Sequence, residues 1–400
     1  MPKKIWAVFE KLIRSIRRIP LIDWIFVCIG LILAMLVRLS LHNLYTADFT
    51  TFAGCYISLQ KMGVAFFKTG CEVYTPFYEY LLYIETILFP KISNTGGPKL
   101  VNILFDFITG WLIFAIVRLK YKTGYIPHLA MFAFLFTPTI ILVSAGWGQF
   151  DSVYTAFLIA CLYFILKDKG WLGCLMFGIA LSIKLQAIAL APFILVLFMR
   201  KKVRFGSLFL VPAVYLALMV PALIAGRPLM DLLTRYFTQV NIYNQVTVNS
   251  PTFYAWLPNV TSNPFYLMGL GLAACIVFLF AFAVFKSEAS LTSERLVLLA
   301  FLSSLIMPFF LPRMHERYFF PADVIAFVFA FYYFPHFFYA PIVVDLISFF
   351  SFQTYLFHTS DIPLQVLSLG IMVMIVLLTR LFIQEFFPAE SLHPEPSQTG

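Results

Sequence analysis

The chain has 400 residues, 61% of them hydrophobic and only 12% charged, with a formal net charge of +9. Soluble domains are about 45–50% apolar and about 25% charged, so this composition argues against an ordinary soluble enzyme or binding module. The cations stand in short clusters between apolar runs, a pattern typical of membrane topology, so nucleic-acid binding is not expected either.

The N-terminal residues 1–19 combine cations with regularly interspersed apolar residues. This pattern predicts a short basic amphipathic helix on the cytoplasmic leaflet. The apolar run 21–39 follows without a small-residue cleavage site, so we expect it to be a retained span. Residues 20–385 are expected to form one transmembrane domain, and residues 386–400, rich in Pro, Ser and Glu, a disordered cytoplasmic tail.

Further apolar runs follow along the chain, at 99–117, 126–144, 150–166, 171–184, 186–199, 205–225, 264–285, 296–311, 318–335, 340–357 and 363–384. The predicted fold class is therefore an all-α, polytopic transmembrane helical bundle of about twelve spans. The runs 171–184 and 186–199 are shorter than the roughly 20 residues that one crossing needs. We expect them to form a broken or re-entrant pair around Lys184.

The segment 74–90 is ambiguous, because it is apolar enough to span the membrane but carries two glutamates. If it lies in the outer interface, the cytoplasmic loops after residue 100 hold 11 Lys and Arg and the outer loops hold 4. If it spans, the numbers reverse, against the positive-inside rule. We therefore expect residues 40–98 to form a first outer loop with interfacial helices, and both termini to be cytoplasmic.

Six cysteines lack metal-type spacing. Those in apolar segments, Cys28, Cys161, Cys174 and Cys275, are expected to be small core residues. Cys55 and Cys71 share the first outer loop, where a disulfide is possible but is not decided by sequence alone.

With this topology, polar residues gather on the non-cytoplasmic side. They lie in the loop with Asp48 and Tyr74, the turn 146–152, the break 182–186, the loop 226–262 and the turn 313–318. The cytoplasmic loops contain no glycine-rich phosphate-binding motif. A chemical site on this side would therefore face away from ATP and nucleotide sugars, and an activated donor would have to arrive on a lipid carrier.

Each grouping also has a simpler structural interpretation. Asp48 can cap an interfacial helix, Asp151 can pair with a neighbouring cation, and Trp147 can anchor the chain at the membrane interface. His315 can belong to an ordinary solvated turn. Lys184 is harder to explain structurally, because a lysine at membrane depth needs a counter-ion or a cavity.

Several short elements occur in a familiar order over residues 40–325. They are Ala47-Asp48-Phe49, Tyr74-Thr75-Pro76-Phe77-Tyr78, Trp147-Gly148-Gln149-Phe150-Asp151-Ser152, Lys184-Leu185-Gln186 with Pro192, Asn249-Ser250-Pro251 with Trp256, and Met314-His315-Glu316-Arg317-Tyr318. In these elements the chain resembles the GT-C type membrane glycosyltransferases. It is most similar to the GPI mannosyltransferase II-like proteins and their bacterial relatives.

The resemblance implies a GT-C-like fold, Asp48 as catalytic residue, and inverting transfer of a hexose, with mannose favoured, from a polyprenyl-phosphate sugar. The acceptor would be a glycan, a lipid-linked glycan or a wall polymer at the outer face of a bacterial plasma membrane. Chemistry agrees, because a carboxylate can take the proton of the attacking hydroxyl and stabilise an oxocarbenium-like transition state.

Roles for the remaining residues follow from their chemistry. Cations can bind the donor phosphate, and the candidates are Lys184, His315, Arg313 and Arg317. Aromatic and polar side chains can bind the sugar or the acceptor, and the candidates are Trp147, Gln149, Asp151, Gln186, Tyr74 and Trp256. No metal ion or other cofactor is expected, because no compact carboxylate cluster with ligand spacing occurs.

Two alternatives remain open. A transporter or flippase for polyprenyl-linked lipids would also use a buried lysine at a helix break, although internal repeats and polar groups reachable from both faces would then be expected. A structural subunit of an envelope-polymer assembly complex would not need Asp48.

Overall fold

The computed structural model describes residues 21–41, 43–72, 74–94, 96–240, 245–258 and 261–388, without the side chains of 21–23 and 238–240. The amphipathic helix predicted at residues 1–19 and the tail predicted at 386–400, apart from its first three residues, lie outside this range. The described chain is mostly helical, and its two short strands form one small parallel sheet. The all-α prediction is confirmed.

The first part of the chain consists of one long helix, a loop with short helices, and a second long helix. The elements are α2 (Leu21–Ser40), α3 (Ala47–Met62), η1 (Gly63–Lys68), α4 (Pro76–Leu88) and α5 (Gly96–Lys120). Helix α4 begins with Pro76, a residue favoured at the first helical position. Its 13 residues span about 20 Å, less than the hydrocarbon thickness of about 30 Å. This length agrees with an interfacial segment.

The middle of the chain contains two broken helices. The elements are α6 (Ile126–Leu135), α7 (Pro138–Ile141), the π-helix η2 (Leu142–Trp147), α8 (Asp151–Leu166), α9 (Gly170–Ile183), η3 (Leu185–Leu190) and α10 (Ala191–Met199). The first break bends the chain by 51° just before Pro138, which cannot donate a backbone hydrogen bond. The second break falls at Lys184, whose backbone is extended, so the predicted interruption there is confirmed.

The remaining elements are α11 (Phe205–Leu208), α12 (Leu210–Ala217), α13 (Val220–Ile224), α14 (Leu229–Val240), β1 (Thr247–Val248), η4 (Phe253–Trp256), α15 (Asn263–Lys286), α16 (Ser293–Phe310), β2 (Met314–His315), η5 (Glu316–Phe319), α17 (Phe320–Tyr332), α18 (Ala340–Leu356) and α19 (Leu364–Phe386). Strand β1 pairs with β2, Thr247 opposite Met314 and Val248 opposite His315. All twelve apolar runs therefore contain helix.

The predicted number of twelve crossings is not confirmed. Within the described residues, five helices are long and apolar enough to cross a membrane, or six if α6 with α7 and η2 is one bent span. They are α5, α11–α13 taken together, α15, α16 and α19. Helix α8 is apolar yet has only 16 residues, and most of them are buried. Such a helix belongs to the protein core rather than to a lipid-facing wall.

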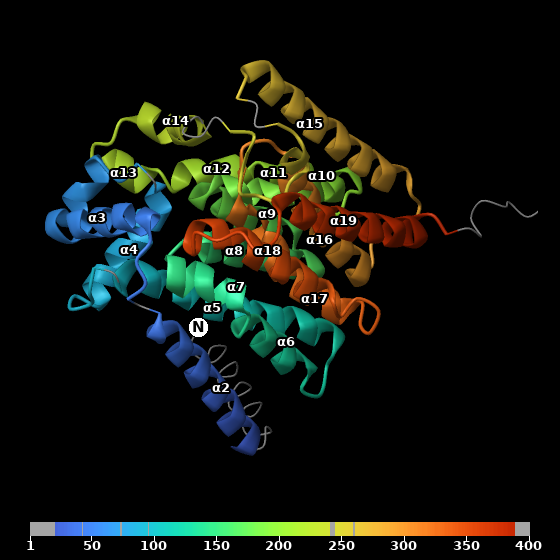
Figure 1. Ribbon diagram of the computed structural model, residues 1–400, viewed down its shortest axis with the longest axis horizontal. Coiled ribbons are helices and arrows are strands. Elements are labelled where there is room, and N and C mark those ends of the chain that lie inside the picture. The colour runs from blue at the N-terminus through green and yellow to red at the C-terminus, as the bar shows by residue number, and fades with distance from the viewer. Residues whose placement is uncertain are drawn as a thin grey trace, which may run out of the picture.

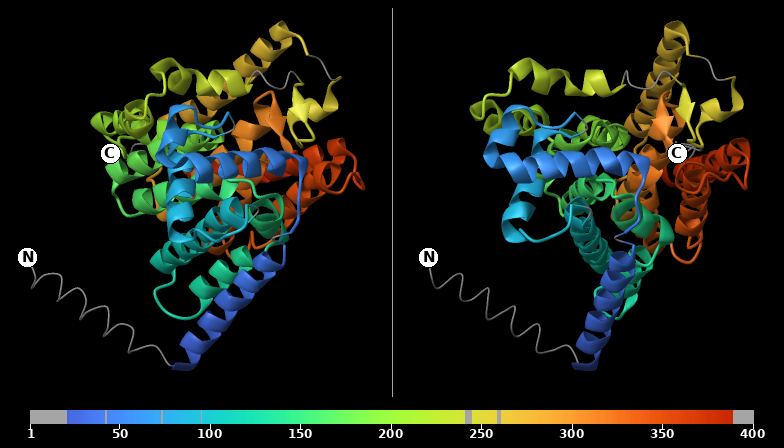
Figure 2. Two further views of the ribbon diagram at one scale, coloured as in Figure 1. Left: turned by 90° about the vertical axis from the view of Figure 1, so that its left-hand side faces the viewer. Right: turned by 60° about the vertical axis from the view of Figure 1, so that its left-hand side comes forward.

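The core lies among α5, α8, α9, α16, α17 and α18, which pack on one another. Helix α2 extends away from this body and contacts it chiefly through α6 and η2 (Figure 1). The loop helices α3 and α4 lie beside each other at one side of the body, with α13 and α14 nearby (Figures 1 and 2). Asp48, Asp151 and Lys184, three of the polar residues singled out in the sequence, come together where α3 meets the core, whereas Arg313 and Trp256 contact other helices.

Candidate active site

Asp48 lies in the first turn of α3, but it is Thr46 that caps this helix, with its hydroxyl accepting from the Phe49 N–H. The Asp48 carboxylate turns instead toward η2 and the start of α8. There it accepts hydrogen bonds from Gln149 Nε2 at 3.0 Å and Trp147 Nε1 at 3.3 Å. The capping interpretation of Asp48 is therefore wrong, and the carboxylate belongs to a side-chain cluster.

The turn between η2 and α8 brings these donors to Asp48. Gly148 has a positive φ of 75°, and a Cβ there would come within 2.4 Å of the Phe49 ring. Glycine therefore allows the turn to pass directly over the first turn of α3. The Trp147 ring is fully buried and stacks on Tyr355, with centroids 4.7 Å apart. It orients Asp48 and offers no open face to a sugar in this conformation.

Lys184 lies in the break after α9 and pairs with Asp151 at the start of α8. Its Nζ is 2.9 Å from both carboxylate oxygens and 4.7 Å from the Phe150 ring centroid. Both side chains are nearly or fully buried. The predicted pairing of Asp151 with a cation is thus present. The cation is Lys184, the lysine that the sequence placed at membrane depth.

The Arg317 guanidinium lies between the carboxylates of Asp48 and Asp151. Its Nη1 is 3.8 Å from Asp48 and its Nε is 3.6 Å from Asp151, while Nη1 also hydrogen-bonds Glu316 at 3.2 Å. The guanidinium lies over the Trp147 ring, 5.2 Å from its centroid. Burial alone would lower the pKa of Arg317, but the adjacent carboxylates outweigh burial and raise it. The cluster therefore holds permanent positive charge among acidic groups.

His315 and Arg313 precede Arg317 in the same turn and differ in placement. His315 pairs through β2 with β1 and is buried, with its ring 5.1 Å from Tyr318. Burial, with help from the Arg317 and Lys184 charges, lowers the His315 pKa to about 3. Arg313 has a positive φ of 62°, and its guanidinium carbon lies 4.0 Å from the Tyr266 ring centroid.

The other predicted sugar-binding residues are spread out. Gln186 lies beside the hydroxyl of Tyr318 and so adjoins the cluster. Tyr74 is buried among aromatic rings, 5.5 Å from Phe52. Trp256 is 52% exposed and donates to Ser368 at the start of α19. The cluster itself thus combines Asp48, Trp147, Gln149, Asp151, Lys184, Gln186, His315 and Arg317.

The carboxylates differ in their access to solvent. The Asp48 side chain is 29% exposed, while Asp151 is fully buried and Glu316 nearly so. Asp48 is therefore the carboxylate that an incoming molecule can reach. Among the described residues, no group of three His, Cys, Asp or Glu side chains is arranged to hold a metal ion.

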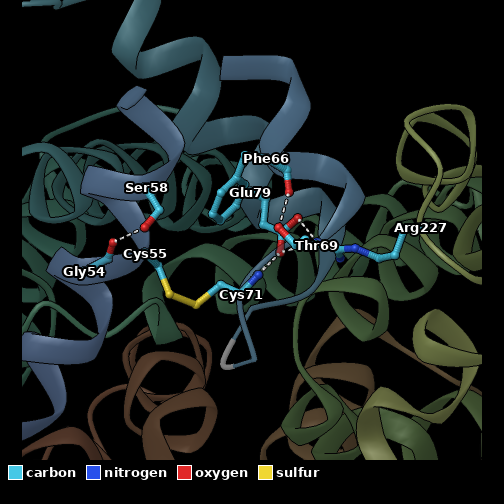
Figure 3. Close-up of a disulfide and its surroundings, with 8 residues drawn as sticks. All are labelled: Gly54, Cys55, Ser58, Phe66, Thr69, Cys71, Glu79 and Arg227. Carbon is cyan, nitrogen blue, oxygen red and sulfur yellow. Dashed lines mark hydrogen bonds and ion pairs between the residues drawn. A yellow bond between two sulfur atoms is a disulfide. The ribbon is translucent and has the colours of Figure 1, made fainter. Parts of the chain in front are cut away.

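The loop that carries Asp48 is cross-linked by a disulfide between Cys55 and Cys71. Figure 3 shows the Glu79 carboxylate between the Cys71 backbone and the Arg227 side chain. It accepts from Cys71 N–H at 2.9 Å and from Arg227 Nη2 at 3.0 and 3.1 Å. A Cβ at Gly70 would lie 1.1 Å from Arg227 Nη2, so glycine leaves the space for this ion pair.

Two hydroxyls, those of Thr75 and of Tyr236 in α14, hydrogen-bond the end of α9. Thr75 Oγ1 donates to the carbonyl of Ile183 at 3.0 Å, and Tyr236 of α14 donates to the carbonyl of Leu181. Both carbonyls lie in the last turn of the helix that stops before Lys184, where the helix itself supplies no partners.

One contributor was not singled out from the sequence. Tyr355 in α18 accepts a hydrogen bond from the Asp48 N–H at 3.0 Å and stacks on Trp147. Its position near the end of an apolar run is the only sequence signal, and it equally fits an interfacial anchor.

The model for glycosyltransferase family 87 matches residues 73–312, more than half of the chain. The chain therefore belongs to glycosyltransferase family 87, and with its long apolar helices it is an integral membrane glycosyltransferase of the GT-C-like class. The match covers the turn 147–152 and Lys184, but not Asp48 or residues 313–317. It does not show the closer likeness to GPI mannosyltransferase II-like proteins. No curated protein sequence matches the chain significantly.

Proposed function

We propose that this glycosyltransferase moves a hexose, with mannose favoured, from a polyprenyl-phosphate sugar to a glycan or lipid-linked acceptor, with inversion at the anomeric carbon. The main support is the position of Arg317 beside the reachable carboxylate of Asp48. Its Nε is buried and has no hydrogen-bond partner in the described part of the chain. A buried N–H without a partner is a group that a bound anion would satisfy.

The proposed reaction is one direct displacement. The acceptor hydroxyl oxygen attacks the anomeric carbon, its proton passes to the Asp48 carboxylate, and the bond from the anomeric carbon to the phosphate oxygen breaks. Polyprenyl phosphate leaves with the electron pair of that bond. The donors Trp147 Nε1 and Gln149 Nε2 hold the carboxylate in one orientation while it accepts the proton.

Arg317 and Lys184 are the proposed partners of the departing phosphate. Arg317 approaches Asp48 and Asp151 at distances longer than a hydrogen bond, so it retains N–H donors for phosphate oxygens. His315 would contribute a neutral N–H, because its low pKa keeps the ring uncharged at neutral pH. Phosphate binding to Arg317 would also release Asp48 to take up the acceptor proton.

Two features support a site on the non-cytoplasmic side of a bacterial plasma membrane. The positive charges after residue 100 favour cytoplasmic loops on the opposite side. The disulfide between Cys55 and Cys71 lies in the loop that carries Asp48, and disulfides persist in oxidising compartments. This orientation favours a lipid-borne donor over a nucleotide sugar.

The test is sugar transfer by the purified protein in liposomes, with a panel of mannosyl, glucosyl and galactosyl polyprenyl phosphates and a membrane lipid extract as acceptor. Asp48→Asn should lower kcat by about 10²–10⁴-fold, the usual contribution of a general base. Asp231→Asn is the matched control, because Asp231 also lies in the first turn of an outer helix and is exposed. It should transfer at the wild-type rate.

Three results would contradict the proposal. Wild-type protein that uses none of the donors would exclude this donor class. Equal rates for Asp48→Asn and wild type would exclude the base. A product with retained anomeric configuration would exclude direct displacement.

A further inference from the structure

One face of α5 carries three buried polar residues, Lys99, Asn102 and Asp106. Their spacing of three and four residues places them in a row on the helix. Each is at most 1% exposed, and α5 is one of the helices long enough to cross a membrane. Polar side chains at such a position need a reason, because burying them is unfavourable unless they are paired.

Asp106 joins both ends of the segment that supplies the donors to Asp48. Its carboxylate accepts from Ser144 Oγ at 2.5 Å and from Ser152 Oγ at 2.7 Å. Ser144 lies in η2 before Trp147, and Ser152 directly follows Asp151. One carboxylate thus links the two ends of the segment 144–152. We call the three residues Asp106, Ser144 and Ser152 the clasp.

Arg38 supplies the counter-charge. Its Nε donates to Asp106 at 2.8 Å, and Nη1 donates to the carbonyls of Ala34 and Leu135. Both charged side chains are fully buried. The ion pair therefore also fixes α2 and α6 against the clasp.

Asn102 and Lys99 contact the backbone of the two segments that meet at Asp48. Asn102 Nδ2 donates to the carbonyl of Gly148 at 2.9 Å, at the middle of the same segment. Lys99 Nζ donates to the carbonyls of Leu41 and Leu44, in the connection that leads into α3 and Asp48. The polar row on α5 therefore contacts both chain segments whose side chains meet at Asp48.

We infer that Asp106 and Asn102 are positioning residues for sugar transfer, which set the separation between the Asp48 carboxylate and the pair of Asp151 and Lys184. This inference rests on the proposed function. Neither residue reaches the substrate. They act through the backbone of segment 144–152, and a displacement of about 1 Å in such a segment can lower a rate by about 10²-fold.

The test removes one hydroxyl of the clasp. Ser152→Ala should lower kcat about tenfold, leave the KM for the polyprenyl-phosphate donor within about twofold, and speed amide hydrogen exchange in residues 144–152. Ser152→Thr, which keeps the hydroxyl, should restore kcat. The matched control is Thr109→Ala on the same helix. Thr109 is equally buried, but its hydroxyl bonds only the carbonyl of Phe105 within α5.

The outcomes separate the possibilities. Wild-type kcat or unchanged amide exchange in Ser152→Ala would overturn the inference. So would an equal loss of kcat in Thr109→Ala, because any buried hydroxyl would then have the same effect. If the wild-type protein transfers no sugar from any donor, the proposed function fails instead, and the exchange measurement still reports on the clasp.

Discussion

The buried pair of Glu79 and Arg227 allows a quantitative prediction about the outer loops. Glu79 is fully buried and Arg227 is 2% exposed, with Nη2 within 3.1 Å of both carboxylate oxygens. Arg227→Met would remove both of these contacts, while the hydrogen bond from the Cys71 N–H at 2.9 Å would remain. Removal of one partner from a buried ion pair lowers the free energy of unfolding by about 3–5 kcal/mol.

The assay is a double-mutant cycle with Arg227→Met and Glu79→Gln, measured by denaturant unfolding of the purified protein in detergent. Each single change should be strongly destabilising. The double variant should lose about 2–3 kcal/mol less than the sum of the two, because it contains no unpaired buried charge. Lys61→Met, which removes an exposed cation from α3, should have little effect. Additive single effects would refute the coupling.

The pH dependence gives a second check on the same pair. Burial raises the pKa of Glu79, and Arg227 opposes this rise, so the pKa should rise further in Arg227→Met. A raised folded-state pKa means that the folded state binds the proton more tightly than the unfolded chain. The loss of unfolding free energy caused by Arg227→Met should therefore be smallest below the unfolded-state pKa of about 4.3. It should grow as the pH rises through the folded-state pKa of Glu79. A deficit independent of pH would contradict this assignment.

Four further predictions concern the site, the disulfide and the membrane orientation. Lys184→Met should lower kcat/KM for the lipid-phosphate donor about 10–100-fold, because a charge-assisted hydrogen bond contributes about 1.5–3 kcal/mol. A wild-type kcat/KM in this variant would exclude the phosphate-binding role of Lys184. His315 keeps its ring neutral when folded, so stability should fall by up to about 1.4 kcal/mol per unit as the pH drops from about 6.5, and His315→Gln should show a smaller slope in unfolding measurements. Joint replacement of Cys55 and Cys71 by alanine should lower stability by about 3 kcal/mol, given the 16-residue separation, and a reductant should then have no further effect. Reporter fusions at 118–122 should be cytoplasmic, and an outer location would separate the cluster from the proposed face.

The sequence predicted where the helices lie, because long apolar runs form helices whether lipid or protein surrounds them. It also predicted the break at Lys184, since a buried lysine between two short apolar runs interrupts both. The number of crossings was not predictable in the same way. Hydropathy does not distinguish a lipid-facing helix such as α15 from a core helix such as α8, most of whose residues are buried.

The site was predictable in its members more than in its geometry. The sequence singled out Asp48, Asp151 and Lys184, and the fold brings them into one cluster, while their roles remain predictions. The directions of side chains depend on packing between distant elements, so the burial of Trp147 and the contact of Arg313 with Tyr266 had no local signal.

The clasp, by contrast, did leave a signal in the sequence. Arg38 and Asp106 are ionisable residues inside predicted apolar spans, and such residues are rarely without a partner. The predicted spans also contain Asp323 and Asp345, so the sequence marks Arg38 and Asp106 as candidates for an ion pair without deciding which residues pair. The connection of Asp106 to the segment 144–152 required the fold, because Ser144 and Ser152 carry no charge that distinguishes them in the sequence.

The hydrogen bonds from the Thr75 and Tyr236 hydroxyls to the last turn of α9 affect the route by which substrates can reach the site. Movement of Thr75 and α14 away from the core would leave the carbonyls of Ile183 and Leu181 without these partners in a largely apolar setting. Each loss would be unfavourable by about 1–3 kcal/mol. We therefore expect these elements to remain in place during turnover. A lipid-borne donor would then enter sideways between helices, from the bilayer, rather than from the water above the loops.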